Sequence, residues 1–358
     1  MTEPGGEPRR RHAGPGSGPH GAPTAIALSP ILSARYRARD LERIRAAAPG
    51  ARLVMVSVEG LADGPVDDVE VMLRGWLSSE AFDRLLARAP RMSWVHSATS
   101  GVERALTPAA LERGLVVTNA RGVFSRPIAE YVLMMILAIS RRLPQLLELQ
   151  RERTWQPLEA TELRDVTVGI VGLGSIGRAV GALATSFGCR VVAVRRRTQD
   201  GSEGAEREDG EPSFGPVRLD RVGGPETLAA LLSESDFIVL AAPLTPETEE
   251  MINAETLAMI KPGAWLINVA RGRLIDERAL LRALRDGHLG GAVLDTFRDE
   301  PLPPMSSFYD LPNVIVTPHT AWSSGRVLDR SVELFCDNLR RFAAGEPLLN
   351  VVDPSAGY

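Results

Sequence analysis

The chain has 358 residues, of which 44% are hydrophobic and 24% are charged, and its formal net charge is −4. This composition is typical of a globular protein with enough chain for two domains, and it excludes a surface that is basic overall, so we expect no nucleic-acid partner. The two cysteines, Cys189 and Cys336, are too few for a disulfide framework or a cysteine-rich zinc site, and no other residue spacing suggests a metal. We therefore expect a cytoplasmic protein without a metal, and no apolar run is long enough to predict a membrane partner.

The first element in chain order is a tail. Residues 1–23 are rich in glycine and proline and have no hydrophobic segment, which predicts disorder and argues against a secretory signal. Short apolar runs then alternate with helical patterns. We predict strands at 24–28, 52–57, 69–73, 92–96 and 115–118, a helix over 31–48, and a second helix from a Ser79 cap to Leu86. This alternation indicates a parallel α/β sheet.

Residues 126–142, RPIAEYVLMMILAISRR, form the most apolar predicted helix. A proline in the first turn and an arginine pair at the end fit the polarity of a helix. Because its middle is apolar all round, we expect this helix to be buried on every side. We interpret it as the connector between two domains and as a contact in a homodimer; a core helix within one chain is the alternative.

A second α/β unit begins with an apolar strand at 167–171, followed by Gly172-Leu-Gly-Ser-Ile-Gly177 and a helix. This is the G-x-G-x-x-G pattern in its expected context of strand, turn and helix. Gly172 would allow the tight turn, Gly174 would let the backbone approach a pyrophosphate, and Gly177 would let helix and strand pack closely. The sequence therefore predicts dinucleotide binding.

The next strand, 190–194, is followed by Arg195, Arg196 and Arg197. An NAD site usually has an acidic residue in this region that binds the ribose hydroxyls, whereas arginines bind a 2′-phosphate. We therefore favour NADP(H), and NAD(H) stays possible because arginine is abundant in this chain. The polar stretch at 199–217 is predicted to be a surface loop.

Three more strands are predicted at 264–269, 291–297 and 313–317, and each is followed by a residue that could do chemistry: Arg271, Glu300 and His319. Ligands of open α/β sheets bind beyond the carboxyl ends of the strands. Arginine can clamp a carboxylate, histidine can protonate a carbonyl oxygen, and a carboxylate can hold the imidazolium. These three residue types suit the reduction of a 2-keto acid to a 2-hydroxy acid.

The chain resembles the D-isomer-specific 2-hydroxyacid dehydrogenase family. The matching stretches are VGIVGLGSIGR, LAAPLTPET, INVARGRLIDERAL, GAVLDTFRDEPLP and VIVTPHTA, with weaker matches at SWVHSATSGVE and VVTNARGVFSRPIAEYVL. The resemblance implies two Rossmann- or flavodoxin-like domains with parallel sheets and a cleft between them. It implies a discontinuous substrate domain (24–123 and 324–352), a dinucleotide-binding domain (124–323) and a homodimer.

The resemblance also assigns residues. Arg271, Glu300 and His319 would be catalytic, and backbone groups of Thr99, Ser100 and Gly101 would bind the substrate carboxylate. The residues expected at the cofactor are Gly172, Gly174, Ser175, Ile176, Gly177, Arg195, Arg196, Pro243, Thr248, Ala270 and Asp295. The arginine run is similar to that of NADPH-using glyoxylate and hydroxypyruvate reductases.

One residue departs from the family pattern. Trp322 stands where a glycine is common after the catalytic histidine, and it would either narrow the substrate mouth or pack on the C-terminal helix.

A non-catalytic, dinucleotide-sensing corepressor is the alternative function, which the intact Arg/Glu/His set argues against. Formate dehydrogenase is a closer, enzymatic alternative, and it is disfavoured because formate oxidation needs no proton relay such as a Glu300–His319 pair. His96 closes a strand near the proposed carboxylate loop, and substrate contact is the less favoured interpretation of it; Trp155 is expected to be a packing residue.

Overall fold

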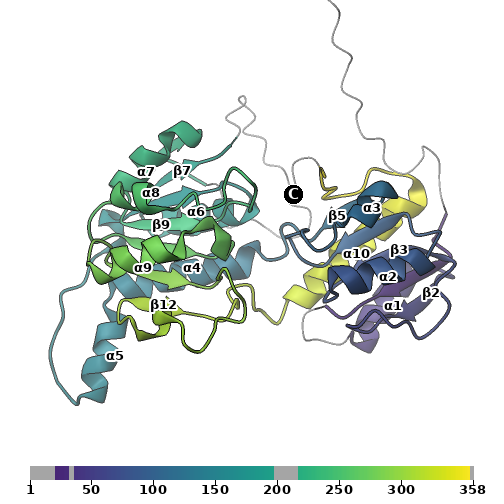
Figure 1. The fold of residues 1–358 in the computed structure, drawn as a ribbon, viewed down its shortest axis with the longest axis horizontal. Coiled ribbons are helices and arrows are strands. Elements are labelled where there is room, and N and C mark those ends of the chain that lie inside the picture. Colours follow the sequence, from purple (N-terminus) through teal and green to yellow (C-terminus); the bar gives the residue numbers. More distant parts are fainter. Residues whose placement is uncertain (1–20, 32–35, 197–216, 355–358) are drawn as a thin grey trace, which may run out of the picture. The chain divides into compact units, whose positions relative to one another are not determined.

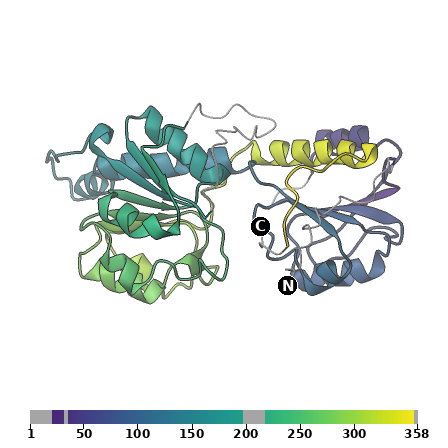
Figure 2. The same ribbon diagram turned by 90° about the horizontal axis from the view of Figure 1, so that it is seen from above.

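A computed structural model describes residues 21–31, 36–196 and 217–354. It divides into two compact units, Met1–Ala120 with Leu328–Tyr358, and Arg121–Val327. We call these the first and second units (Figures 1 and 2). The predicted boundaries were 123/124 and 323/324. The predicted N-terminal tail and the 199–217 loop fall almost wholly outside the described residues.

The first unit is built on a five-stranded parallel sheet in the order β2-β1-β3-β4-β5 within the described residues. Its strands are β1 Ala25–Leu28, β2 Arg52–Met55, β3 Val69–Arg74, β4 Trp94–Ser97 and β5 Val116–Asn119. This order is the flavodoxin-like one. The predicted parallel α/β class is therefore confirmed for this unit.

Helices cover both faces of this sheet. One face packs on α1 (Ala38–Ala47) and α10 (Val327–Ala344), and the other packs on α2 (Ser79–Arg88) and α3 (Pro108–Glu112), as Figure 2 shows. Phe335 of α10 and Phe82 of α2 are both fully buried in these two cores. The C-terminal helix thus belongs to the first unit although it follows the second in sequence.

Two predicted helix starts were wrong. The first helix begins at Ala38 rather than at residue 31, because the Asp40 carboxylate accepts a hydrogen bond from the backbone N–H of Arg37 and fixes the start there. Ile31 is instead buried in the core. The cap of α2 is Ser78, whose hydroxyl oxygen accepts a hydrogen bond from the Ala81 N–H at 3.1 Å, so Ser79 is already helical.

The second unit contains a seven-stranded parallel sheet in the order β12-β11-β10-β9-β6-β7-β8 within the described residues. The strands are β6 Thr167–Val171, β7 Arg190–Val194, β8 Arg221–Gly223, β9 Phe237–Leu240, β10 Trp265–Asn268, β11 Gly291–Leu294 and β12 Val314–Val316. The strand order reverses on either side of β6, which places a topological switch point at the strand that precedes the glycine-rich turn.

Apolar residues of three helices, α7 (Leu228–Glu234), α8 (Ala254–Ala258) and α9 (Glu277–Arg285), pack on one face of this sheet. Helices α4 (Ser125–Ser140) and α6 (Ser175–Ser186) pack against each other on the other face (Figure 2). The predicted second Rossmann-like domain is confirmed.

Helix α4 differs from its prediction in two ways. It ends at Ser140, because Arg142 adopts a left-handed conformation with φ 58°, and a separate helix, α5 (Leu143–Arg151), follows. It is also not buried on every side within one chain, since Met134 is 51% exposed. No residue of α5 is buried, and Trp155, expected to pack, is fully exposed. This region therefore presents apolar surface that the described chain leaves uncovered.

Candidate active site

The glycine-rich turn between β6 and α6 shows why each glycine is needed. Gly172 has φ +100°, and a Cβ there would lie 2.5 Å from the Ala242 backbone nitrogen. A Cβ on Gly177 would lie 2.1 Å from the Gly172 carbonyl oxygen. By contrast, a Cβ on Gly174 would meet nothing within 4 Å. Two glycines are thus required by the fold, whereas Gly174 leaves space open.

That open space fits a pyrophosphate. Gly174 is the N-cap of α6, and no side chain among the described residues caps the helix. The N–H groups of Ser175, Ile176 and Gly177 in the first turn therefore point toward a position where a phosphate would be favoured by hydrogen bonding and by the helix dipole. The residues present fit a dinucleotide cofactor.

Arg195 and Arg196 follow β7 directly. The backbone N–H of Arg195 donates to the Gly223 carbonyl at 3.0 Å, so β8 fixes the chain at this point. The Arg195 Nε is buried without a hydrogen-bond partner in the described chain. Arg196 lies close enough to Glu247 to help lower the pKa of that carboxyl, after the larger effects of hydrogen bonds from the Thr245 hydroxyl and from the backbone. Arg196 therefore lies near the loop that follows β9.

Two other loops carry the predicted cofactor residues Pro243, Thr248 and Ala270. The Thr248 hydroxyl donates to the Pro243 carbonyl at 2.7 Å and so closes the loop after β9 on itself. After β10, the buried Ala270 is held by a 3.0 Å hydrogen bond from its N–H to the Asn268 side-chain oxygen. Both loops leave the sheet at the same edge as the glycine-rich turn, because all seven strands are parallel.

Arg271 is brought toward Glu300 by a close backbone approach. It precedes Gly272, where a Cβ would lie 1.9 Å from the Phe297 carbonyl carbon, so only glycine fits between the two loops. The Arg271 guanidinium also donates to the Ala270 carbonyl at 2.8 Å. Its positive charge contributes to lowering the pKa of Glu300. The structure therefore places Arg271 and Glu300 near each other.

Glu300 and His319 are in direct contact. The Nδ1 atom of His319 lies 2.8 Å from one Glu300 carboxylate oxygen, and the other oxygen accepts a 3.0 Å hydrogen bond from the Phe297 N–H. Partial burial raises the pKa of Glu300, but the bonds from His319 and Phe297 and the charges of His319 and Arg271 outweigh it, so this pKa lies below its ordinary value. An ionised Glu300 fixes the imidazole and leaves Nε2 as the atom that can exchange a proton with a substrate.

Asp295 supports the turn that carries His319. The residue is buried, and its carboxylate accepts hydrogen bonds from the Thr317 hydroxyl at 2.6 Å and from the N–H groups of Thr320 and Ala321 at 2.8 and 2.9 Å. The Trp322 indole N–H donates to the His319 carbonyl at 2.6 Å. The sequence analysis assigned Asp295 to the cofactor and predicted neither its hydrogen bonds to this turn nor the bond from Trp322. No spacing rule links an aspartate at the end of one strand to the turn that follows the next strand.

The predicted carboxylate-binding residues Thr99, Ser100 and Gly101 lie in the first unit, just beyond the carboxyl end of β4. The Thr99 hydroxyl donates to the Gly101 carbonyl at 2.7 Å, and the Asn119 side chain donates to the Ser100 carbonyl at 3.1 Å. These bonds fix the loop while the residues stay half-buried. His96, at the end of β4, is fully buried, with Nδ1 2.8 Å from the Thr118 hydroxyl oxygen.

Within residues 21–31, 36–196 and 217–354, no cluster of His, Cys, Asp or Glu has the arrangement of a metal site. None of the helices in these ranges combines the length and the hydrophobicity that crossing a membrane requires.

Comparison with known proteins connects this geometry to a family. The family model described as "D-isomer specific 2-hydroxyacid dehydrogenase, NAD binding domain" matches residues 133–321. A glyoxylate reductase of Korarchaeum cryptofilum is 32% identical over 88% of this chain and 90% of its own length. A D-3-phosphoglycerate dehydrogenase of Mycobacterium bovis is 33% identical over 93% of this chain, which spans only 57% of that longer enzyme.

Solved structures agree. A D-isomer specific 2-hydroxyacid dehydrogenase from Xanthobacter autotrophicus, in complex with NADPH and MES, has a TM-score of 0.78 and 32% identity over 94% of this chain and 100% of its own. An NADPH-dependent glyoxylate/hydroxypyruvate reductase from Sinorhizobium meliloti, with NADP and sulfate, has a TM-score of 0.75 and 27% identity over 94% of this chain and 100% of its own. These enzymes do not favour the non-catalytic alternative. The chain belongs to the D-isomer specific 2-hydroxyacid dehydrogenase family and is a nicotinamide-dinucleotide-dependent dehydrogenase.

Proposed function

We propose that this protein reduces small 2-keto acids, such as glyoxylate and hydroxypyruvate, to D-2-hydroxy acids with NADPH. The observation that carries the proposal is the convergence of three groups at one edge of the second unit's sheet. Glu300 contacts His319 at 2.8 Å, and the charge of Arg271 acts on the same carboxylate. The names of the glyoxylate reductase relatives support the substrate class.

Each of the three side chains has a role in this reaction. The Arg271 guanidinium binds the carboxylate and polarises the carbonyl of the keto acid. His319 donates the proton from Nε2 to the carbonyl oxygen, and Glu300 stabilises the imidazolium that precedes this transfer. The reduced nicotinamide, when bound, supplies the hydride. We also propose that Thr99, Ser100 and Gly101 bind the substrate carboxylate through backbone N–H groups.

The direct test is to follow NADPH and NADH absorbance with glyoxylate, hydroxypyruvate, pyruvate and a bulkier 2-keto acid. We expect turnover to be fastest with glyoxylate and hydroxypyruvate. Absence of turnover with every acid and both cofactors, combined with a stoichiometric protein partner in a pull-down, would instead support the corepressor-like function.

We propose a preference for NADPH over NADH, which rests on Arg195 and Arg196 at the end of β7. Two guanidinium groups would stabilise a 2′-phosphate, and the buried, unpartnered Arg195 Nε leaves a donor for it. Arg195→Asp should weaken NADP⁺ binding about 10- to 100-fold, the effect of losing a charge-assisted hydrogen bond, and should spare NAD⁺. Arg285→Asp, an exposed arginine at the end of α9, is the matched control. An unchanged NADP⁺/NAD⁺ ratio would refute this assignment.

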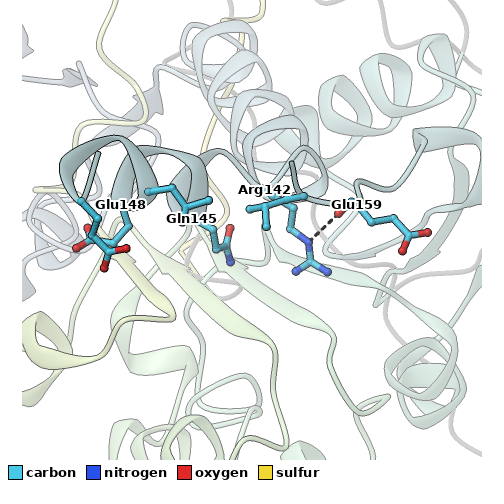
Figure 3. A pocket seen from close by; sticks show the side chains of 7 residues that line it. Arg142, Gln145, Glu148 and Glu159 are labelled. Carbon is cyan, nitrogen blue, oxygen red and sulfur yellow. Dashed lines mark hydrogen bonds between the residues drawn. The ribbon is translucent and has the colours of Figure 1, made fainter. Parts of the chain in front are cut away.

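We propose that the protein is a homodimer whose interface includes α5 and the segment after it. Leu143, Leu146 and Leu147 are 45, 40 and 43% exposed, and Trp155 is fully exposed. Exposed leucines that gather within two turns of one helix are typical of a protein–protein contact. A pocket lies beside α5, shown in Figure 3, and its lining residues are Arg142, Gln145, Glu148, Leu149, Glu152, Leu158 and Glu159. The pocket lies on the opposite face of α5 from Leu143, Leu146 and Leu147, so the dimer proposal rests on these exposed leucines rather than on the pocket.

Sedimentation velocity tests the dimer. The wild type should sediment at twice the chain mass, and the double variant Leu146→Glu, Leu147→Glu should sediment as a monomer. The control is Met305→Glu, since Met305 is 92% exposed elsewhere in the second unit. A monomeric wild type would contradict the proposal.

We further propose a reducing cytoplasmic location, which is supported by two buried cysteines that form no disulfide.

A further inference from the structure

The backbone at His319 has a conformation that its surroundings must hold. His319 has φ +48°, a left-handed value that few residues other than glycine adopt. The flanking residues are fixed by Asp295, which receives the hydroxyl of Thr317 before His319 and the N–H groups of Thr320 and Ala321 after it. The position of the His319 side chain thus depends on how well Asp295 is oriented.

A tyrosine on helix α4 adds a further hydrogen bond to those that Asp295 accepts. The Tyr131 hydroxyl lies 2.7 Å from the Thr317 hydroxyl oxygen. Thr317 has one hydroxyl proton, and it points to the Asp295 carboxylate at 2.6 Å, which can only accept. Tyr131 must therefore be the donor to Thr317. The direction of donation runs from Tyr131 to Thr317 to Asp295, and it ends at the turn that holds His319.

Tyr131 keeps its proton throughout the pH range in which such enzymes work. Burial raises its pKa to about 12, the negative charge of Asp295 acts in the same direction, and the bond to Thr317 opposes both. Its side chain is only half-buried, and the neighbouring α4 residues Glu130 and Met134 are exposed. The ring therefore adds less to the core than those of fully buried aromatics, and its polar hydroxyl is the group with a defined partner.

We propose that Tyr131 is a positioning residue for His319: its hydroxyl orients Thr317, Thr317 orients Asp295, and Asp295 holds the turn on which the proton donor sits. The inference rests on the proposed function of His319 and extends it to a residue of helix α4. It also connects α4, the first helix of the second unit, to the catalytic turn.

The kinetic test compares Tyr131→Phe with Tyr309→Phe, which removes the hydroxyl of a 54% exposed tyrosine in the same unit. Loss of one hydrogen bond in the chain should lower kcat for glyoxylate by about 3- to 10-fold, with KM and the Kd for NADPH within about twofold of wild type. Thr317→Val should lower kcat further, and Thr317→Ser should restore most of it. Because Tyr131 and Thr317 act through the same series of hydrogen bonds, adding Tyr131→Phe to Thr317→Val should lower kcat little further.

A spectroscopic readout does not depend on turnover. The chain has five histidines, so the imidazole signals of His319 can be assigned in a nitrogen–proton NMR spectrum by their absence in His319→Gln. Tyr131→Phe should shift these signals, and Tyr309→Phe should not. If the wild type reduces no 2-keto acid, the proposed function fails while this readout still decides the positioning role. The inference is overturned if the His319 signals stay unchanged in Tyr131→Phe, or if its kcat equals that of Tyr309→Phe.

Discussion

Two alanine substitutions in the glycine-rich turn should have opposite effects on folding and on cofactor binding. At Gly177, a new Cβ would lie 2.1 Å from the Gly172 carbonyl oxygen, which is backbone and cannot rotate away. At Gly174, the new Cβ would meet no atom within 4 Å, and the residue has φ −84°, which alanine adopts without strain. Gly177→Ala therefore tests the fold, and Gly174→Ala tests the phosphate site.

The sizes of these effects follow from the contacts. An overpacked site costs about 1–3 kcal/mol, which lowers the Tm of a domain of 150–250 residues by about 2–12 °C. Gly177→Ala should show this loss. Gly174→Ala should leave the Tm nearly unchanged, because a stabilisation of about 0.4–1 kcal/mol from the less flexible unfolded chain offsets the cost of alanine at the N-cap of α6. If its Cβ displaces one charge-assisted phosphate contact, worth about 1.5–3 kcal/mol, NADPH should bind about 10- to 150-fold more weakly.

The assay is differential scanning fluorimetry of both variants and the wild type, with NADPH titration followed by fluorescence. Equal losses of Tm in the two variants would refute the distinction between a fold glycine and a phosphate glycine. Wild-type NADPH affinity in Gly174→Ala would show that the backbone there does not approach the pyrophosphate.

Three other predictions concern single side chains. Burial lowers the pKa of His96 from 6.5 to about 3, so its contribution to stability is complete above pH 6.5 and is lost as the pH falls toward 3. Between pH 7 and pH 5, the free energy of unfolding from urea titrations should fall by about 2 kcal/mol more in the wild type than in His96→Gln. An equal fall in both proteins would contradict this prediction. Trp322→Phe removes the donor to the His319 carbonyl and should lower kcat about 3- to 10-fold in steady-state assays, whereas an unchanged kcat would make Trp322 a packing residue only. Gly272→Ala should lower both the Tm and kcat, because its Cβ would meet the Phe297 backbone and separate Arg271 from Glu300. Wild-type activity in this variant would show that the close contact between the Gly272 and Phe297 backbones is not needed.

The sequence predicted best where a local pattern and a backbone requirement coincide. The β6 strand, the glycine-rich turn and the start of α6 occupy the predicted positions, because a strand, a tight turn and a helix N-terminus each need particular residues at fixed offsets. The same reasoning found Glu300 and His319 at neighbouring strand ends, since parallel strands bring their carboxyl ends to one edge.

Features that depend on contacts between distant residues were not predictable in this way. The start of α1 is set by the Arg37–Asp40 interaction rather than by apolar periodicity. The exposed side of α4 carries Arg126 and Glu130 near its start, but the middle of the helix is apolar all round in sequence, so periodicity did not show that Met134 lies outside the core. The link from Tyr131 through Thr317 to Asp295 joins residues 186 and 22 positions apart, and only their arrangement in the fold reveals it.

The most direct measurement of the central claim is the turnover of glyoxylate by wild type and His319→Gln, with NADPH affinity determined for both. If His319 is the proton donor held by Glu300, kcat should fall by about 10²- to 10⁴-fold, the usual contribution of general acid catalysis, while the Kd for NADPH stays within about twofold. Turnover by His319→Gln at the wild-type rate would contradict the account.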